Sequence, residues 1–591
     1  MPASHYQPPL EDFRFVQQYC LQAEKEWCRL PAHQGLDQET ADRVLEAAGR
    51  FCADVLAPLN GPADLQGCRL EHGRVLTPDG FAKAYADFVE AGWPALACDP
   101  SVGGQGLPQL LDTALHEMLA SANHGWAMYP GILHGAYACL HAHGDDYIRR
   151  TYLPSIVSGR WLATMCLTEP QAGSDLGLLR TQALPEQDGS YRLHGNKIFI
   201  SGGDQDMSEN IVHLVLARLP DAPAGTRGLS LFLAPRLIPQ EQGLVPNTIY
   251  CDGIEKKMGI KGSATCTMRF EAAQAWLLGK PHQGLAAMFV MMNSARLHVG
   301  LQGLGHAQAA WQLARAYAHE RHQMRVQPRP ATAKGAADPI AHHPAMQRIL
   351  ADLRVWTEGM RVMAAWTAHQ LDLAQNLPEG EEQTQALSLA SLLTPVVKSF
   401  FTERGFALAS DALQVFGGYG YVHEYRIEQT LRDVRIAMIY EGTNQIQALD
   451  LLQRKIAAVG PEALQPLLQA WRGEADACLS AMADCPWGKA LRQWSDHLHE
   501  VTTHLCTRAQ HDMHVLARCA EDYLRLVGTV CMAFAWARAG RVSRLQADTS
   551  LCERKVASAD YFFDHGLLDA RYYLSRIEAT AASTVPMQKL V

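Results

Sequence analysis

The chain has 591 residues, of which 48% are hydrophobic and 19% are charged. This length is too great for one hydrophobic core, so we expect several domains with the composition of an ordinary soluble protein. The formal net charge of −9 argues against nucleic acid as a main partner, because phosphate binding needs a cationic surface; a local basic groove stays open as an alternative.

Cysteine usage and the apolar segments predict a cytoplasmic protein. The 15 cysteines are scattered, odd in number and lack a CxxC pair, which favours a reduced compartment. Residues 1–15 carry Glu11, Asp12 and Arg14 and contain no apolar core of signal-peptide length. The most apolar stretch, residues 527–537, is short for a bilayer span of roughly 20 residues, so we expect a buried helix and no stable membrane insertion.

After an N-terminal extension over residues 1–35, the pattern predicts a helical domain over residues 36–160. Apolar residues recur at helical spacing from Leu45 to Val55, and Pro58 ends that run. The character changes near residue 161, where short apolar runs are separated by Gly, Pro and Asp. This pattern predicts strands and turns, and therefore a middle β domain over residues 161–282.

Long helical periods return at residues 288–320, 346–373 and 386–416 and predict a helical bundle domain over residues 283–456. Residues 327–339 are rich in Pro, Ala, Gly and Lys, which predicts an exposed loop between the first two helices.

Residues 461–591 form a further predicted helical domain without a catalytic motif. Apolar residues such as Tyr523, Val527, Val530 and Phe534 lie at helical spacing. We expect this domain to bury an apolar face and stabilise the assembly. A membrane-surface role, suggested by three arginines after the apolar stretch, is the weaker alternative.

Glu441 is the strongest candidate for catalysis. An apolar stretch leads to this carboxylate, Gly442 follows it, and Thr443 is placed to cap the next helix. A carboxylate between apolar neighbours loses hydration, which raises its pKa and suits it to remove a proton from a weak carbon acid. A helix dipole would favour the anion instead, and the sequence leaves open which effect is larger.

Four further motifs accompany Glu441, at residues 166–175, 197–203, 256–263 and 414–420. Small residues in the first would let the backbone approach a flat heterocycle, although an ordinary β-turn is the alternative. In order and spacing, these motifs resemble those of the flavin-dependent acyl-CoA dehydrogenases over roughly residues 40–456.

The resemblance implies an α+β, mostly α fold, in which an N-terminal helical domain, a middle β-barrel domain and a four-helix bundle follow one another. The extra C-terminal helical domain makes the layout similar to that of the larger members, such as the 3-methylmercaptopropionyl-CoA dehydrogenases and the very-long-chain enzymes.

The resemblance also implies FAD as cofactor. Arg321 and residues 414–418 would serve the flavin of a neighbouring subunit, which predicts a homodimer. The residues implied in FAD binding are Met165, Leu167, Thr168, Ser174, Phe199, Ser201, Arg321, Gln414, Gly417, Gly418, Thr443 and Gln445.

Several of these positions depart from the family pattern or have a simpler interpretation. Phe199 stands where better-known members have Trp, and its alternative is a core strand residue. Arg321 lacks the Phe-Gly that usually follows it, and its alternative is a solvated helix charge. Gly417 could be a plain helix C-cap. Asn293 stands where the family often has Asp, and Arg296 could be structural.

The implied reaction, in fatty acid metabolism, converts a saturated acyl-CoA to the trans-2-enoyl-CoA. Glu441 would take the C2 proton and flavin N5 the hydride from C3, and an electron-transfer flavoprotein would reoxidise the flavin. We expect a short or medium substrate, for example 3-methylmercaptopropionyl-CoA. The residues implied in substrate binding are Ser174, Asn293, Arg296, Tyr440 and Gly442.

Two rival functions stay open. An acyl-CoA oxidase would use the same base and pass electrons to O2, and a non-catalytic DNA-binding relative would keep only the fold. Glu441 and the negative net charge weigh against the second. His504, His511 and His514 lie close in sequence, but they lack a convincing fourth ligand, so we expect no metal.

Overall fold

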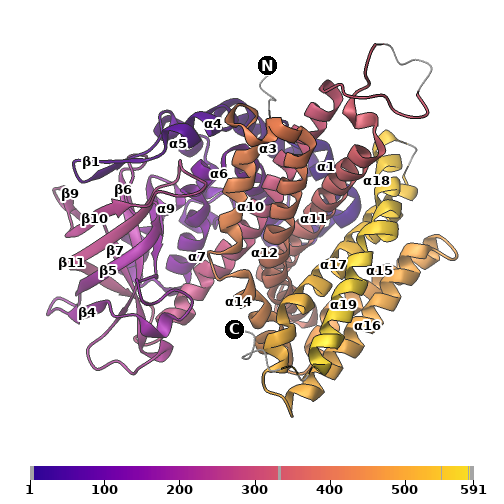
Figure 1. Ribbon diagram of the computed structural model, residues 1–591. Helices are drawn as coiled ribbons and strands as arrows, with labels where there is room; N and C mark the ends of the chain where they lie inside the picture. The colour runs from indigo at the N-terminus through magenta and orange to yellow at the C-terminus, as the bar shows by residue number, and fades with distance from the viewer. Residues whose placement is uncertain (1–5, 330–334, 547–548, 584, 586–591) are drawn as a thin grey trace. The chain divides into compact units, whose positions relative to one another are not determined.

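A computed structural model describes residues 6–329, 335–546, 549–583 and 585 (Figure 1). The chain divides into two compact units. The first comprises residues 1–8 and 47–298, and the second comprises residues 9–46 and 299–591. The mostly α fold with a separate sheet confirms the predicted fold class. The division of the chain into the five segments expected from the sequence remains a prediction.

The helices of the first unit surround α6, which is buried along almost its whole length, including Asp112 and Glu117. A short hairpin interrupts the region predicted to be only helical, because His72 and Gly73 both adopt positive φ and join two three-residue strands. The elements are α4 (Ala57–Gln66), β1 (Arg69–Glu71), β2 (Arg74–Leu76), α5 (Phe81–Glu90), α6 (Gln109–Ala127) and α7 (Leu133–His143).

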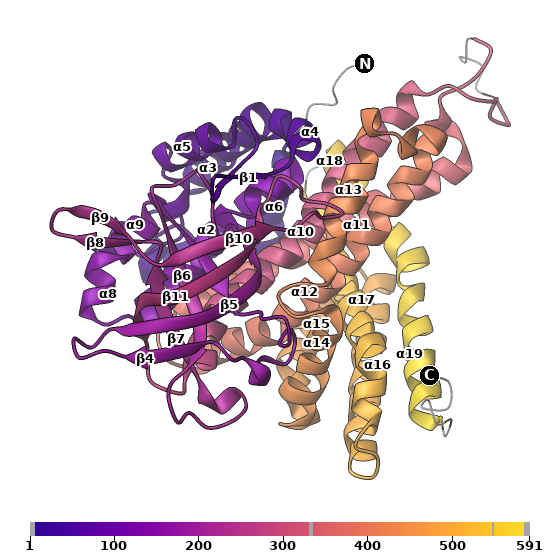
Figure 2. The same ribbon diagram turned by 60° about the vertical axis from the view of Figure 1, so that its left-hand side comes forward.

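Seven strands of the first unit form one sheet in the order β10-β11-β5-β4-β6-β3, and β7 pairs with both β11 and β6 (Figure 2). This double pairing closes the sheet, as the resemblance to a β-barrel domain predicted. Its interior is apolar and includes Val215, Phe232, Cys266 and Phe270. The strands are β3 (Trp161–Cys166), β4 (Gln182–Pro185), β5 (Tyr191–Ser201), β6 (Asn210–Arg218), β7 (Leu229–Pro235), β10 (Ile249–Ile254) and β11 (Thr265–Leu278).

The second unit is helical. It contains most of α10, which begins in the first unit, and most of α3, which ends in the first unit. The predicted loop after α10 is not uniformly exposed, because Asp338 is buried and accepts hydrogen bonds from Arg329; residues 330–334 lie outside the described residues. The helices are α1 (Leu10–Phe15), α2 (Ala23–Arg29), α3 (Gln38–Arg50), α10 (Gly284–Glu320), α11 (Pro344–Asn376), α12 (Glu381–Phe416), α13 (Ile427–Val434) and α14 (Asn444–Leu449).

The C-terminal helices pack around α17, which also contacts α11, α12 and α14 (Figure 1). Residues 527–537 are fully buried in α17, which confirms the prediction of a buried helix. Among the described helices, none has the length and apolar character needed to cross a membrane. These helices are α15 (Gln465–Ala481), α16 (Pro486–Ala509), α17 (Val515–Arg544), α18 (Ser550–Tyr561) and α19 (Leu568–Ala582).

Candidate functional site

Glu441 lies in a sharp turn of the second unit, between α13 and α14. Its φ is +57° and that of Gly442 is +83°, so two successive residues are left-handed. This conformation costs a non-glycine residue roughly 1–2 kcal/mol. Thr443 Oγ1 accepts a hydrogen bond from the Ile446 N–H at 3.3 Å, which confirms the predicted N-cap of α14. The half-buried carboxylate therefore sits on a strained backbone, as is common at functional sites.

A buried polar network holds this turn. Gln447, which is 0% exposed, donates from Nε2 to the Glu441 carbonyl at 3.2 Å and lies 3.5 Å from the Gly442 carbonyl. Asn444 Oδ1 accepts from Lys398 Nζ at 3.0 Å and from Thr402 Oγ1 at 3.2 Å, both on α12. The α12 helix therefore anchors the turn. Sequence reasoning missed this support; the signal available was a lysine inside an apolar helical pattern.

Tyr440 links the same turn to α10. Its hydroxyl donates to Gln302 Oε1, a residue that sequence reasoning also missed. Burial and the nearby charge of Glu441 raise the pKa of Tyr440 well above its usual range, so the phenol stays protonated at neutral pH. Tyr440 directly precedes Glu441 in the chain, so a side chain anchored to α10 adjoins the candidate base.

Arg321 and residues 414–418 come together around a cavity of about 360 Å³ in the second unit. The Arg321 guanidinium lies 5.4 Å from the centre of the Tyr419 ring, and the Tyr317 ring stacks on Phe416 at 4.3 Å. A Cβ added at Gly417 or Gly418 would meet no atom within 4 Å, so the glycine faces are open. An arginine beside open backbone can receive paired phosphate oxygens.

Gln445 differs from the other candidate cofactor residues of the second unit. It is exposed, and its Nε2 donates to Glu521 Oε2 of α17 at 3.2 Å. Its amide therefore also ties the start of α14 to the C-terminal helices.

In the first unit, Thr168 follows the end of β3, where Met165 is buried and Leu167 is half-buried. The Thr168 carbonyl accepts a hydrogen bond from the Ile198 N–H at 2.9 Å. A buried ion pair reinforces this contact, because Lys197 Nζ lies 2.8 Å from Glu169 Oε1. The two motif segments at residues 166–175 and 197–203 are therefore fastened side by side.

Burial alone would raise the pKa of the Glu169 carboxyl. The charge of Lys197 and hydrogen bonds from Lys197, Thr181 and the Arg180 N–H outweigh burial and lower this pKa to about 2. Glu169 is thus an anion at neutral pH, and its role is to hold the loop rather than to exchange protons.

Phe199 sits at a β-bulge. Ile198 and Phe199 of β5 face a single residue of β11, Thr267, and the φ of Phe199 is +60°. The bulge turns the ring outward, and Phe199 is 59% exposed. The alternative interpretation of Phe199 as a core strand residue is therefore wrong.

The remaining candidates of the first unit differ in exposure. Ser174, in the segment of residues 166–175, is exposed, and Ser201, in the segment of residues 197–203, is half-buried. On α10, Asn293 is exposed and Arg296 is buried, and Arg296 Nη1 lies 3.5 Å from Asn293 Oδ1.

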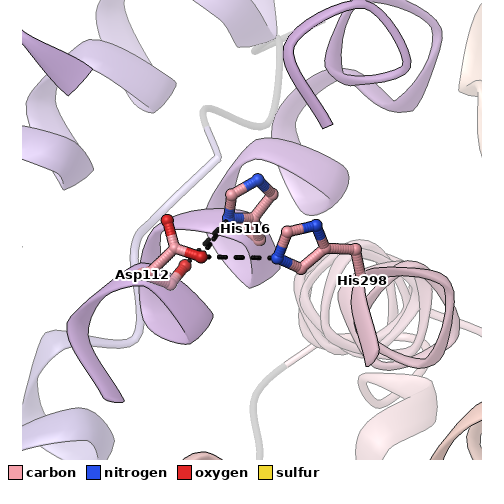
Figure 3. Close-up of side chains that lie close together, drawn as sticks. All are labelled: Asp112, His116 and His298. Carbon is pink, nitrogen blue, oxygen red and sulfur yellow. Dashed lines mark hydrogen bonds and ion pairs between the residues drawn. The ribbon is translucent and has the colours of Figure 1, made fainter. Parts of the chain in front are cut away.

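Asp112, His116 and His298 form a polar cluster of the first unit that sequence reasoning missed (Figure 3). The only signal was the spacing of Asp112 and His116, which are one helical turn apart, because His298 is far away in sequence. The histidines considered from sequence, His511 and His514, are instead exposed.

Four family models match the chain, one after another along the sequence. These are the acyl-CoA dehydrogenase N-terminal domain (residues 38–160), middle domain (164–273) and C-terminal domain (282–456), and the acetyl-CoA dehydrogenase C-terminal like domain (469–588). The chain belongs to the acyl-CoA dehydrogenase family, which uses FAD. The predicted enzyme class and cofactor are confirmed.

A similar curated protein is the 3-methylmercaptopropionyl-CoA dehydrogenase of Ruegeria pomeroyi, which is 38% identical over 98% of this chain and 99% of its own length. Caenorhabditis elegans ACDH-11 in complex with C11-CoA has a TM-score of 0.76 at 21% identity, covering 97% of this chain and 94% of that one. The acyl-CoA dehydrogenase of Bacillus anthracis complexed with FAD has a TM-score of 0.75 at 20% identity, covering 97% and 93%. The two structures show the fold.

Proposed function

We propose that the protein catalyses the α,β-dehydrogenation of a saturated acyl-CoA to the trans-2-enoyl-CoA, with Glu441 removing the C2 proton. The observation that carries this proposal is the strained, left-handed Glu441 held by a buried network. A base must be held within hydrogen-bond reach of one particular proton, and a turn fixed in this way meets that need.

The residues present fit FAD. In the second unit, the cavity beside Arg321 has open glycine faces that suit a diphosphate. Thr443 and Gln445 lie at the start of α14 in the same unit. In the first unit, the exposed Phe199 ring is turned outward next to the loop that carries Thr168. Following the family pattern, Met165, Leu167, Ser174 and Ser201 would complete the flavin contacts, and Arg321 with residues 414–418 would serve the flavin of a neighbouring subunit.

Bound FAD supplies the acceptor for the two electrons that leave C3 with its hydrogen. The chain's own part is the proton at C2. The Glu441 carboxylate would take this proton, and the Gln447 and Asn444 hydrogen bonds fix the backbone of the turn that carries it. As the proton leaves, negative charge develops on the thioester carbonyl oxygen, and the Glu441 N–H would donate to that oxygen, as the family pattern implies.

For the substrate, we propose a short thioether acyl-CoA such as 3-methylmercaptopropionyl-CoA. Support comes from the relative of that name, which matches this chain almost from end to end. Ser174, Asn293, Arg296, Tyr440 and Gly442 would contact the acyl-CoA. An electron-transfer flavoprotein is the proposed acceptor of the electrons, and O2 is the acceptor in the competing oxidase function.

A panel of acyl-CoAs tests the proposal. Under anaerobic conditions, 3-methylmercaptopropionyl-CoA, butyryl-CoA and longer chains are mixed with the yellow holoenzyme, and the loss of flavin absorbance is followed. We expect the short thioether to bleach the flavin fastest and the product to be the enoyl-CoA by mass spectrometry. No bleaching by any member would contradict the proposed reaction. Rapid reoxidation by O2 with release of H2O2 would identify an oxidase.

A further inference from the structure

The Asp112 cluster joins α6 to the part of α10 that lies in the first unit. Asp112 and His116 lie one turn apart on α6, and His298 comes from α10 (Figure 3). Asp112 Oδ2 lies 3.3 Å from His116 Nδ1 and 3.3 Å from His298 Nε2. A carboxylate oxygen of Asp112 and one ring nitrogen of each histidine lie within 4.8 Å of one another. The carboxylate and both imidazoles thus present their donor atoms to one small volume.

The hydrogen bond on the other side of the His298 ring shows which charges must lie between this ring and Asp112. His298 Nδ1 lies 3.0 Å from the Gly131 carbonyl, which can only accept, so Nδ1 carries a hydrogen. In a neutral ring, Nε2 then holds a lone pair that faces the Asp112 carboxylate oxygen. Two lone pairs at this distance repel each other, so a positive particle, either a proton or a metal ion, must lie between them.

His116 Nδ1 also needs a proton or a metal ion between it and the oxygen atoms that it faces. Its Nδ1 lies 3.0 Å from the Asp112 carbonyl and 3.3 Å from Asp112 Oδ2, so this nitrogen also points at oxygen atoms only. Each nitrogen can meet the requirement with a hydrogen. A single divalent ion can meet both, with neutral rings.

Two of the spacings between the donor atoms suit an ion. With bonds of roughly 2.0–2.2 Å to nitrogen and oxygen, the ligand atoms of a tetrahedral Zn²⁺ lie roughly 3.3–3.5 Å apart. The two distances to Asp112 Oδ2 are 3.3 Å. The contact from His298 Nδ1 to the Gly131 carbonyl is also the outer contact that typically orients a metal-binding histidine.

We propose that Asp112, His116 and His298 bind one divalent transition-metal ion, with Zn²⁺ as the best match to two imidazoles and a carboxylate. The site uses none of the residues assigned to the acyl-CoA reaction and would crosslink α6 to α10. The imidazole rings now stack in parallel at 3.8 Å, and binding would tilt them so that both nitrogens converge on the ion. The carbonyl of Asp112 or a water would supply the fourth ligand.

Metal analysis of the FAD-loaded enzyme tests the site. The protein is dialysed against a chelating resin, loaded with ZnCl2, desalted and measured by plasma mass spectrometry. We expect about one more Zn²⁺ per chain in the wild type than in His298→Gln or Asp112→Asn. His511→Gln, which removes an exposed histidine, and Cys28→Ser, which removes an exposed thiol, are the matched controls and should retain this ion.

Equal zinc content in the wild type and His298→Gln would overturn the proposal. If the variants fold poorly, as judged by FAD content and circular dichroism, X-ray absorption of the Zn²⁺-loaded wild type decides instead. Two imidazoles and a carboxylate around zinc support the site, and a thiolate-rich or water-only shell overturns it. Nitrogen-15 NMR that finds both His116 and His298 doubly protonated in the zinc-treated enzyme also overturns it.

Discussion

At the scale of single residues, Glu441 combines a reactive group with a backbone conformation that favours glycine. Replacement by Gln keeps the shape and removes the ability to accept the C2 proton. We expect Glu441→Gln to lower the rate of flavin reduction by about 10²–10⁴-fold, because this is the usual contribution of a general base. FAD content should be unchanged. The rate of flavin reduction is measured by stopped flow. Reduction of the variant at the wild-type rate would show that another residue is the base.

Gln447 is predicted to act through Glu441, as a positioning residue. Gln447→Met fills a similar volume but removes the hydrogen bond to the Glu441 carbonyl. The Glu441 carbonyl then lacks its donor, which costs about 1–3 kcal/mol and should lower kcat by roughly 5- to 150-fold, with KM and FAD content little changed.

Gln493→Met on the exposed face of α16 is the control for Gln447→Met and should behave as the wild type. A Gln447→Met enzyme that loses stability but keeps its kcat would show that Gln447 only supports the fold.

At the scale of elements, the ion pair of Glu169 and Lys197 fastens the Thr168 loop to β5. Lys197→Met leaves a buried carboxylate without its partner, so we expect a loss of about 3–5 kcal/mol in the free energy of unfolding. Urea denaturation followed by circular dichroism measures this loss. The double variant Glu169→Gln with Lys197→Met should recover part of it, and a double variant less stable than Lys197→Met would contradict the pairing.

The same pair predicts a pH dependence. The pKa of Glu169 is lowered from 4.5 to about 2 in the folded protein, so the folded state binds this proton less readily than the unfolded state. Its stabilising effect is therefore complete above pH 4.5 and is lost as the pH falls toward 2. Between these limits, the Tm of the wild type should fall more steeply than that of the double variant. Parallel curves would rule out Glu169 as the group responsible.

At the scale of the whole molecule, the C-terminal helices should stabilise the assembly. The α17 helix is buried, contacts α11, α12 and α14, and bonds to Gln445 through Glu521. We predict a yellow homodimer, because Arg321 and residues 414–418 would serve a neighbouring flavin. Removing residues 461–591 should expose apolar surface, increase binding of a hydrophobic dye and shift the protein toward monomers.

Light scattering and flavin absorbance check the assembly of the intact enzyme. A monomer with fully bound FAD would contradict the shared site. Strong, salt-sensitive binding to anionic vesicles would favour a membrane-surface role for the C-terminal helices over a purely structural one.

Local patterns in the sequence were enough to predict the long helices, the β domain, the buried α17 segment, the Thr443 cap and the family, because helix period, strand alternation and turn chemistry are properties of neighbouring residues. The motifs also singled out Glu441 and the glycines at 417 and 418.

Only the tertiary structure decided which side chains meet. It brought Lys398 to Asn444, Gln302 to Tyr440 and His298 to Asp112, pairs that are 46, 138 and 186 residues apart. It also turned Phe199 outward at a bulge, which depends on the register of β5 against β11. Such contacts follow from how whole elements pack to bury their polar groups in pairs, and no local pattern encodes that choice of partner.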